Sequence, residues 1–225
     1  MKSNEDLQRD VQNAIKWEPL LHAAEIGVTV KDGVVNLKGT VDSYAKKLEA
    51  EEAAKNVAGV KAVVEKIQIK SEHWGETSDN EIATEVLSAL KWDWQVPNDK
   101  VKVKVKVENG WITLTGELAW NYQKEAAKKA VNNLNGVQGV TNNITIKSEV
   151  HDAIEQKDVE NALERNWSIN ADDIKVKVSG TKVTLTGTVT SWYQKDEAAR
   201  IAWKTPGIWT VENELEVEYD YLMVD

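Results

Sequence analysis

The sequence predicts an α+β protein of three tandem domains, each with the element order α-β-β-α-β. One observation is a recurring strand motif: LKGTV at 37–41, LTGEL at 114–118 and LTGTV at 185–189. A second is that each motif glycine is followed by another glycine 20 residues later, at Gly59, Gly136 and Gly207. A repeat of 71 to 77 residues is long enough for a small core. Each copy is therefore expected to be a domain rather than a layer of a solenoid.

The repeat also sets the expected domain boundaries, which fall near Ser71 and Ser148. The expected domains are residues 1–71, 72–148 and 149–225.

Each copy begins with a segment of helical period. Apolar residues at i, i+4, i+7 and i+8 indicate an amphipathic helix, and they recur 75 residues apart in the first two copies: Leu7, Val11, Ala14 and Ile15, then Ile82, Val86, Ala89 and Leu90. The third copy has Glu155 where Leu7 and Ile82 stand.

Two strands follow in each copy. Alternating valines and isoleucines have the period of a half-buried strand. Asp32-Gly33 and Asn109-Gly110 then supply the positive φ angles of a two-residue hairpin turn. In the third copy the turn is expected at Ser179-Gly180. Because Gly180 is one residue farther from its strand glycine than Gly33 and Gly110 are from theirs, a longer loop is expected there.

The second helix and third strand complete the unit. Small residues such as Ala53, Ala130 and Ala198 predict close packing of this helix on the sheet, and Gly59, Gly136 and Gly207 are expected to end it. The third strand should lie parallel to the second, because a helix crosses over between them. Each three-stranded mixed sheet then carries two helices on one face, and the other face is left to water or a neighbour.

These residues resemble the BON (bacterial OsmY and nodulation) domain family in three tandem copies. The family pattern is an alternating strand, a DG or NG turn, V-x-L-x-G-x-V, an Ala-rich helix and Gly-Val before the last strand. Here it reads VTVKDGVVNLKGTV, VKVENGWITLTGEL and VKVSGTKVTLTGTV. The resemblance implies a bacterial, transport-associated or osmotic stress response protein that attaches to phospholipid or other envelope components without catalysis.

The net charge and the distribution of apolar residues exclude some classes of function. The formal net charge is −9 over 225 residues, without a broad basic surface, so nucleic acid is not an expected partner. No apolar stretch has the length of a membrane span, and residues 1–10 lack the pattern of a signal peptide. The chain is therefore expected to be soluble and cytoplasmic, or periplasmic if a signal peptide has been removed.

Residues for catalysis are sparse. The chain has no cysteine, and its three histidines, His22, His73 and His151, are too far apart in sequence for a helical metal pair. The expectation is a protein without enzymatic activity, metal or cofactor. Backbone carbonyls holding a small ion or metabolite between domains remain an alternative.

Lysines and tryptophans of the second copy are the candidate binding residues. Lys102, Lys104 and Lys106 alternate with valines and share one strand face. They suit anionic lipid headgroups, or they keep an edge strand from pairing with other chains. A third interpretation pairs them, within or between chains, with the acidic strand of the third copy, Glu212, Glu214 and Glu216.

Aromatic residues gather at two places in the repeat. Trp17, Trp92 and Trp94 lie at the end of the first helix, and Trp167 aligns with Trp94. A second group, at the start of the second helix, is Tyr44, Trp120, Tyr122, Trp192 and Tyr193. These rings suit a membrane interface or a seam between small domains. Trp111 is expected on the sheet face opposite the helices.

The leading hypothesis is a stress-associated binding module that attaches to anionic phospholipid through Lys102, Lys104, Lys106, Trp92, Trp94 and Trp111. It predicts binding that weakens with salt. The alternative is a protein-interaction or chaperone-like scaffold, which includes association with a second copy and predicts binding that persists in salt but depends on tryptophan.

Overall fold

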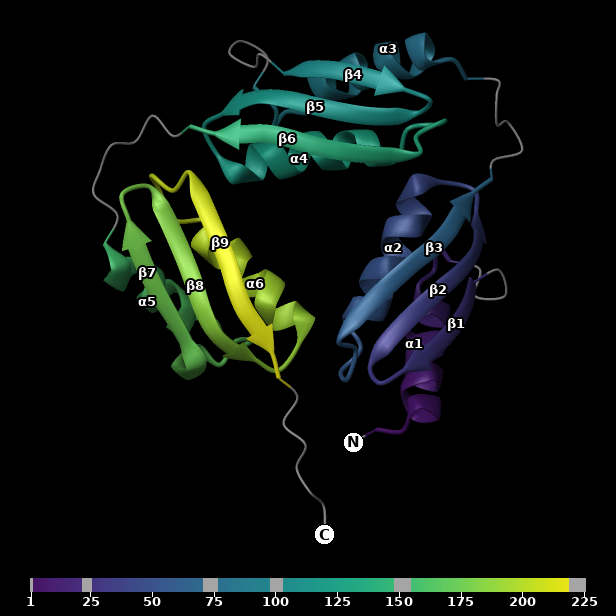
Figure 1. Cartoon of the computed structure of the whole chain (residues 1–225). Coiled ribbons are helices and arrows are strands. Elements are labelled where there is room, and N and C mark those ends of the chain that lie inside the picture. Colours follow the sequence, from purple (N-terminus) through teal and green to yellow (C-terminus); the bar gives the residue numbers. More distant parts are fainter. Residues whose placement is uncertain (1, 22–25, 71–76, 98–102, 148–154, 219–225) are drawn as a thin grey trace. The chain divides into compact units, whose positions relative to one another are not determined.

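The computed structural model describes residues 2–21, 26–70, 77–97, 103–147 and 155–218. These residues form six α-helices and three separate three-stranded sheets. The predicted fold class, three tandem α+β domains, is confirmed. Figure 1 shows the two helices of each domain on the same side of its sheet. The boundaries expected at Ser71 and Ser148 lie outside the described residues.

The elements follow the same order in every domain (Figure 1). The first domain contains α1 (Asn4–Trp17), β1 (Ile26–Lys31), β2 (Val34–Val41), α2 (Tyr44–Lys55) and β3 (Ala62–Ile69). The second contains α3 (Asp79–Trp92), β4 (Lys104–Glu108), β5 (Trp111–Leu118), α4 (Asn121–Asn132) and β6 (Gly139–Ile146). The third contains α5 (Gln156–Glu164), β7 (Ile174–Ser179), β8 (Lys182–Val189), α6 (Trp192–Ala202) and β9 (Thr210–Val217), with a 3₁₀ turn at Ala171–Asp173.

The sheets are mixed, as expected. In the second and third domains the hairpin strands are antiparallel and the last strand lies parallel to the central one. Alternate residues of each strand face the helices and form the core, which in the third domain includes Val159, Leu163, Leu185, Ala198 and Leu215. The opposite face of each sheet carries no helix, so its residues remain on the surface.

A polar bond ties the first helix to the hairpin turn. The Asp79 carboxylate, in the first turn of α3, accepts hydrogen bonds from the backbone N–H groups of Asn109 (2.8 Å) and Gly110 (2.9 Å). In the first domain Asn4 Oδ1 likewise accepts from the N–H of Asp32 (2.9 Å). The start of this helix therefore lies beside the hairpin turn, and its end lies at the opposite end of the domain.

A second polar bond ties the third strand to the second helix. Asn142 Nδ2 donates to the backbone carbonyl of Lys124 (2.8 Å), and Asn213 Nδ2 donates to that of Lys195 (2.7 Å). Both asparagines lie among apolar residues on the helix-covered face of their strand. An amide is accommodated there because a helix carbonyl accepts its hydrogen bond.

The third hairpin corrects one expectation. A longer loop was expected, but Ser179 pairs with Lys182, which leaves the two-residue turn Gly180-Thr181. Gly180 has a φ of +61° in the first turn position, where a type II′ turn requires glycine. Compared with the first two domains, glycine occupies the first and not the second position of the turn, and the turn still has two residues.

The end of the second helix corrects another expectation. The helices end at Lys55, Asn132 and Ala202, four or five residues before Gly59, Gly136 and Gly207. These glycines lie in the turn that leads to the third strand. A Cβ on Gly136 would lie 3.0 Å from Cδ1 of the buried Ile82, and one on Gly59 would lie 3.3 Å from Leu7. Because these glycines have no side chain, the first helix can pack close to this turn.

The motif glycine of the third domain has a specific steric role. The backbone of Asp173 crosses over Gly187, so a Cβ there would lie 1.9 Å from the Asp173 carbonyl oxygen. Gly187 also has a φ of +121°, which other residues adopt only with strain. The segment before β7 therefore makes a close backbone approach to this glycine.

We expect Gly187→Ala to lower the free energy of unfolding of the third domain by about 2 kcal/mol or more, because the backbone must move to admit the methyl group. Urea unfolding of the full chain measures this change. Gly180→Asn is the matched control. A Cβ at Gly180 meets nothing within 4 Å, asparagine tolerates positive φ, and the change should stay within about 0.5 kcal/mol. Equal effects of the two substitutions would contradict the steric explanation.

Candidate functional site: the helix-end turns

A short anchored turn follows the first helix of every domain. We name these segments, Glu18–Leu21, Asp93–Val96 and Asn166–Ile169, the helix-end turns. In each one the N–H of the last residue donates to the carbonyl of the first, over 3.0, 3.0 and 3.2 Å. The last residue, Leu21, Val96 or Ile169, is buried in the core. The turn is thereby fixed at one end, while one of its central residues, Leu20, Trp94 or Trp167, is strongly exposed.

The helix-end turns and the residues before them expose large apolar side chains. The exposed fractions are 84% for Trp17, 83% for Trp92, 88% for Trp94 and 96% for Trp167. Leu20 of the first turn is 60% exposed. Exposed apolar side chains that lie together, as Trp92 and Trp94 do in sequence, often mark an interaction site. The sequence placed these four tryptophans correctly at the end of the first helix.

Basic residues accompany these side chains. Lys16 and Lys91 lie in the last turns of α1 and α3, and Arg165 directly follows α5. All three are exposed. Cations at this position are favoured by the partial negative charge at a helix C-terminus. Each helix end therefore combines exposed apolar surface with a positive charge.

The turn of the third domain is held by further hydrogen bonds. Asn166 Oδ1 accepts from the backbone N–H (3.0 Å) and the hydroxyl (2.7 Å) of Ser168. Gln194 Nε2, from α6, donates to the Ser168 carbonyl (3.2 Å). Trp167 is therefore presented on a rigid loop, and little conformational entropy is lost when a surface covers it.

A carboxylate on α6 also holds this turn. Glu197 accepts a hydrogen bond from Asn166 Nδ2 (2.9 Å) and pairs with Arg200. Hydrogen bonding to Arg200, followed by the bond from Asn166, lowers the pKa of Glu197 below its usual value despite partial burial. Glu197 therefore stays ionised at neutral pH. Next to these groups a shallow hollow of about 670 Å³ lies between α5 and α6, with Trp167, Arg165 and Lys204 among its lining residues.

Of the strand lysines of the second domain, Lys104 lies toward the end that carries the helix-end turn, and Lys106 lies in the middle of the strand. Lys104 and Lys106 are exposed and pair with Thr115 and Thr113 on the open face of the sheet. β4 runs toward the hairpin turn, so Lys104 begins it at the end where α3 finishes. Lys106 Nζ lies 2.8 Å from Glu108 Oε1. Lys102 lies outside the described residues.

Trp111 lies apart from Trp92 and Trp94, the other predicted tryptophans of the second domain. It is 55% exposed and starts β5, next to the hairpin turn that binds the start of α3. Since α3 has 14 residues, it is about 20 Å long, so Trp92 and Trp111 lie at opposite ends of the domain. The Trp111 ring covers Gly139 of the neighbouring strand, where a Cβ would lie 2.3 Å from it. An aromatic ring over a strand glycine stabilises the strand pair.

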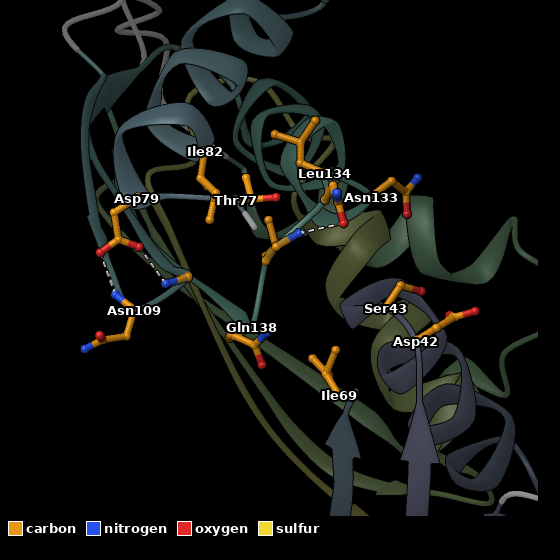
Figure 2. A pocket seen from close by; sticks show the side chains of 14 residues that line it. Asp42, Ser43, Ile69, Thr77, Asp79, Ile82, Asn109, Asn133, Leu134 and Gln138 are labelled. Carbon is orange, nitrogen blue, oxygen red and sulfur yellow. Dashed lines mark hydrogen bonds between the residues drawn. The ribbon is translucent and has the colours of Figure 1, made fainter. Parts of the chain in front are cut away.

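A hollow beside the start of α3 is built from groups that stabilise the fold. Figure 2 shows its second-domain side, with Thr77, Asp79 and Ile82 facing Leu134 and Gln138. The dashed lines from Asp79 are its bonds to the backbone N–H groups of the hairpin turn (Figure 2). Both carboxylate oxygens are thus used to hold that turn in place.

Groups for metal binding do not assemble in the part of the chain that the structure describes. Within residues 2–21, 26–70, 77–97, 103–147 and 155–218, no three His, Asp or Glu side chains are placed to hold a metal ion. His22, His73 and His151 fall outside these ranges. Among the described helices, none has the length and hydropathy of a membrane span.

The anchored turn itself was missed by the sequence reasoning. Its signal is a buried apolar residue six positions after the last core residue of the first helix: Leu21 after Ile15, Val96 after Leu90 and Ile169 after Leu163. This spacing identifies the turn in all three domains, and it separates the protruding Trp94 and Trp167 from core positions.

A known protein is similar in sequence to part of this chain. The chain is 29% identical to the osmotically-inducible protein Y of Escherichia coli (strain K12) over 131 residues. The match covers 56% of this chain and 64% of the relative, just under two thirds of its length.

Solved structures give weaker similarities. One is the C-terminal domain of CdsD, a structural protein of the type III secretion system of Chlamydia trachomatis, at 18% identity and a TM-score of 0.26 over 96% of this chain and all of that one. Another is the PrgH periplasmic domain, at 12% identity and a TM-score of 0.22 over 86% of this chain and 95% of that one. Similarities of this size carry no information on function.

The BON domain family model matches the chain three times, at residues 3–71, 78–148 and 151–219. These ranges contain the three α-β-β-α-β domains described above. The chain therefore belongs to the BON domain family, in three tandem copies.

Proposed function

We propose that this chain is a non-enzymatic, stress-associated module that binds peripherally to anionic phospholipid surfaces through its helix-end turns. The observation that carries the proposal is that Trp17, Trp92, Trp94 and Trp167, at two nearby positions of the repeat, are each more than four fifths exposed. Tryptophan partitions into the interface between lipid headgroups and acyl chains. Similarity to an osmotically-inducible protein supports the association with stress.

The electrostatic part of the proposal comes from neighbouring cations. Lys16, Lys91 and Arg165 lie beside the tryptophans at the helix ends. In the second domain Lys104 and Lys106, with Lys102 before them in sequence, add positive charge on the edge strand. A lysine near an anionic membrane contributes about 1 kcal/mol, and salt weakens this attraction.

An interaction scaffold is the second candidate function, and Trp111 favours it. Trp111 shares the open face of the second sheet with Lys104 and Lys106. It lies at the opposite end of the domain from Trp92 and Trp94, the tryptophans of the proposed lipid-binding surface. A large exposed ring on a flat polar face is typical of a protein contact.

We expect Trp92→Ala/Trp94→Ala to weaken binding to anionic vesicles by more than about tenfold. Burying even half of one tryptophan removes about 100 Å² of apolar surface from water, which contributes roughly 2 kcal/mol. Vesicle flotation with the full chain, together with the blue shift of tryptophan emission, measures the change.

Trp111→Ala is the control for this experiment, because it removes an exposed tryptophan at the other end of the domain. It should leave vesicle affinity unchanged. If Trp111→Ala abolishes binding and the double variant binds normally, the open sheet face is the binding surface and the scaffold candidate gains support.

We further expect Lys104→Gln/Lys106→Gln to weaken binding to anionic vesicles by about tenfold at low salt and to have no effect at high salt. The matched control is Lys31→Gln/Lys38→Gln, two exposed strand lysines of the first domain. Flotation across a salt series measures both variants. A salt-independent loss, or an equal loss in the control, would argue against a specific role for the β4 lysines.

A further inference from the structure

The open face of the third domain separates its charges by strand. β7, one edge of the sheet, presents the exposed Lys175 and Lys177. β9, the other edge, presents Glu212, Glu214 and Glu216. The central strand β8 presents Thr184, Thr186 and Thr188 between them. One edge of this face is therefore basic and the other is acidic.

The strand register aligns these charges in rows. Lys177 is level with Thr184, which is level with Glu212. Lys175 is level with Thr186, which is level with Glu214. Each row thus runs from a lysine through a threonine to a glutamate across the face.

We propose that two copies of this chain associate face to face through this surface, about a two-fold axis parallel to β8. Such an axis places β7 of one copy over β9 of the other, at the same height along the strands. Lys177 then faces Glu212 of the second copy, and Lys175 faces its Glu214. The contact is isologous, so each ion pair occurs twice.

The centre of the face permits this approach. The threonine row is short-chained and polar, and sheets that pack face to face lie about 10 Å apart. Packed sheets are usually rotated by about 30° relative to each other, and lysine side chains are long enough to span the offset that this rotation causes. Lys182 is on the central strand β8, so the two-fold axis places it opposite Lys182 of the second copy. Its Nζ, however, lies 2.5 Å from Glu212 Oε1 of its own chain. Its charge is therefore neutralised before association.

The principal charges of this face have no partner within the described part of the chain. Among residues 155–218, the ion pairs are Lys182 with Glu212 and Arg200 with Glu197. Lys175, Lys177 and Glu214 are exposed and form no ion pair there. A second copy would pair Lys175 with Glu214 in both directions, and its Glu212, already bound to Lys182, would be shared with Lys177.

The equivalent face of the second domain lacks this self-complementarity. Lys104 and Lys106 occupy the positions of Lys175 and Lys177. Lys104 and Lys175 pair with the residue just before the glycine of the central strand, and Lys106 and Lys177 pair with the residue three positions before it. The third strand, however, carries Thr141, Asn143 and Thr145 where β9 has three glutamates. The same two-fold arrangement would place lysine over threonine or asparagine there.

The size of the face predicts a weak association. Three strands of eight residues or fewer cover about 14 by 26 Å, or roughly 370 Å² on each copy. Stable interfaces bury about 1,200 Å² or more in total. The expected dimer is therefore weak and salt-sensitive. It does not depend on the lipid binding proposed above, although it would join two sets of helix-end turns.

Charge reversal in the full chain tests the proposal. Lys175→Glu/Lys177→Glu makes both edges of the face acidic, and Glu212→Lys/Glu214→Lys makes both edges predominantly basic, although Glu216 remains on β9. Sedimentation velocity over a wide concentration range should show each variant dissociating at least about tenfold more readily than the wild type. An equimolar mixture of the two variants should form a heterodimer, because both edges are then complementary.

Three results would overturn the proposal. One is a wild-type chain that stays monomeric up to millimolar concentration at low salt. Another is a mixture of the two variants that associates no better than either variant alone. The third is loss of association in Lys104→Glu/Lys106→Glu but not in Lys175→Glu/Lys177→Glu, which would assign the acidic strand to the basic face of the second domain. Tryptophan emission and thermal unfolding check that every variant is folded.

Discussion

A three-stranded sheet covered on one face only is the constraint on which the rest of this structure depends. Each domain places its apolar residues on the helix-covered face, where Leu37, Leu114 and Leu185 are fully buried. The open face and the ends of the helices contribute little to that core. Their residues are therefore free to differ between copies without loss of folding, and this freedom lets one repeated fold carry different surfaces.

The three domains are alike at the ends of their first helices but differ on their open sheet faces. Every domain retains an exposed tryptophan at or just after the end of its first helix (α1, α3 or α5), near a basic residue. The open faces have diverged: the second has a ring, Trp111, over Gly139, and the third has opposite charges on its two edge strands. A feature that is repeated suits a shared ligand such as a lipid surface. A feature confined to one copy suits a specific contact, as proposed for the third domain.

The sequence predicted the fold almost completely, because hydrophobic period and glycine spacing are local signals that repeat three times. The sequence-based prediction was wrong where a glycine has a different position or role from the one that its motif suggested. The Gly180-Thr181 turn keeps its length because glycine takes the first turn position, and Gly136 serves the packing of Ile82 and not the end of α4. The candidate site was predicted in part. Alignment located Trp94 and Trp167, but only the bond from Asp79 to the hairpin turn shows that Trp111 lies at the other end of the domain. The matching rows of charge on the third sheet needed the strand register, which no periodicity contains.

Hydrogen exchange of the full chain, measured by mass spectrometry with and without anionic vesicles, tests most directly whether binding is separate from folding. The account predicts slower exchange around residues 15–21, 90–97 and 163–169, which contain the helix-end turns, and unchanged exchange in the central strands β2, β5 and β8. Slower exchange confined to the open sheet faces, or faster exchange in the central strands on binding, would contradict it. Either result would mean that the domains bind through their sheets or unfold to bind.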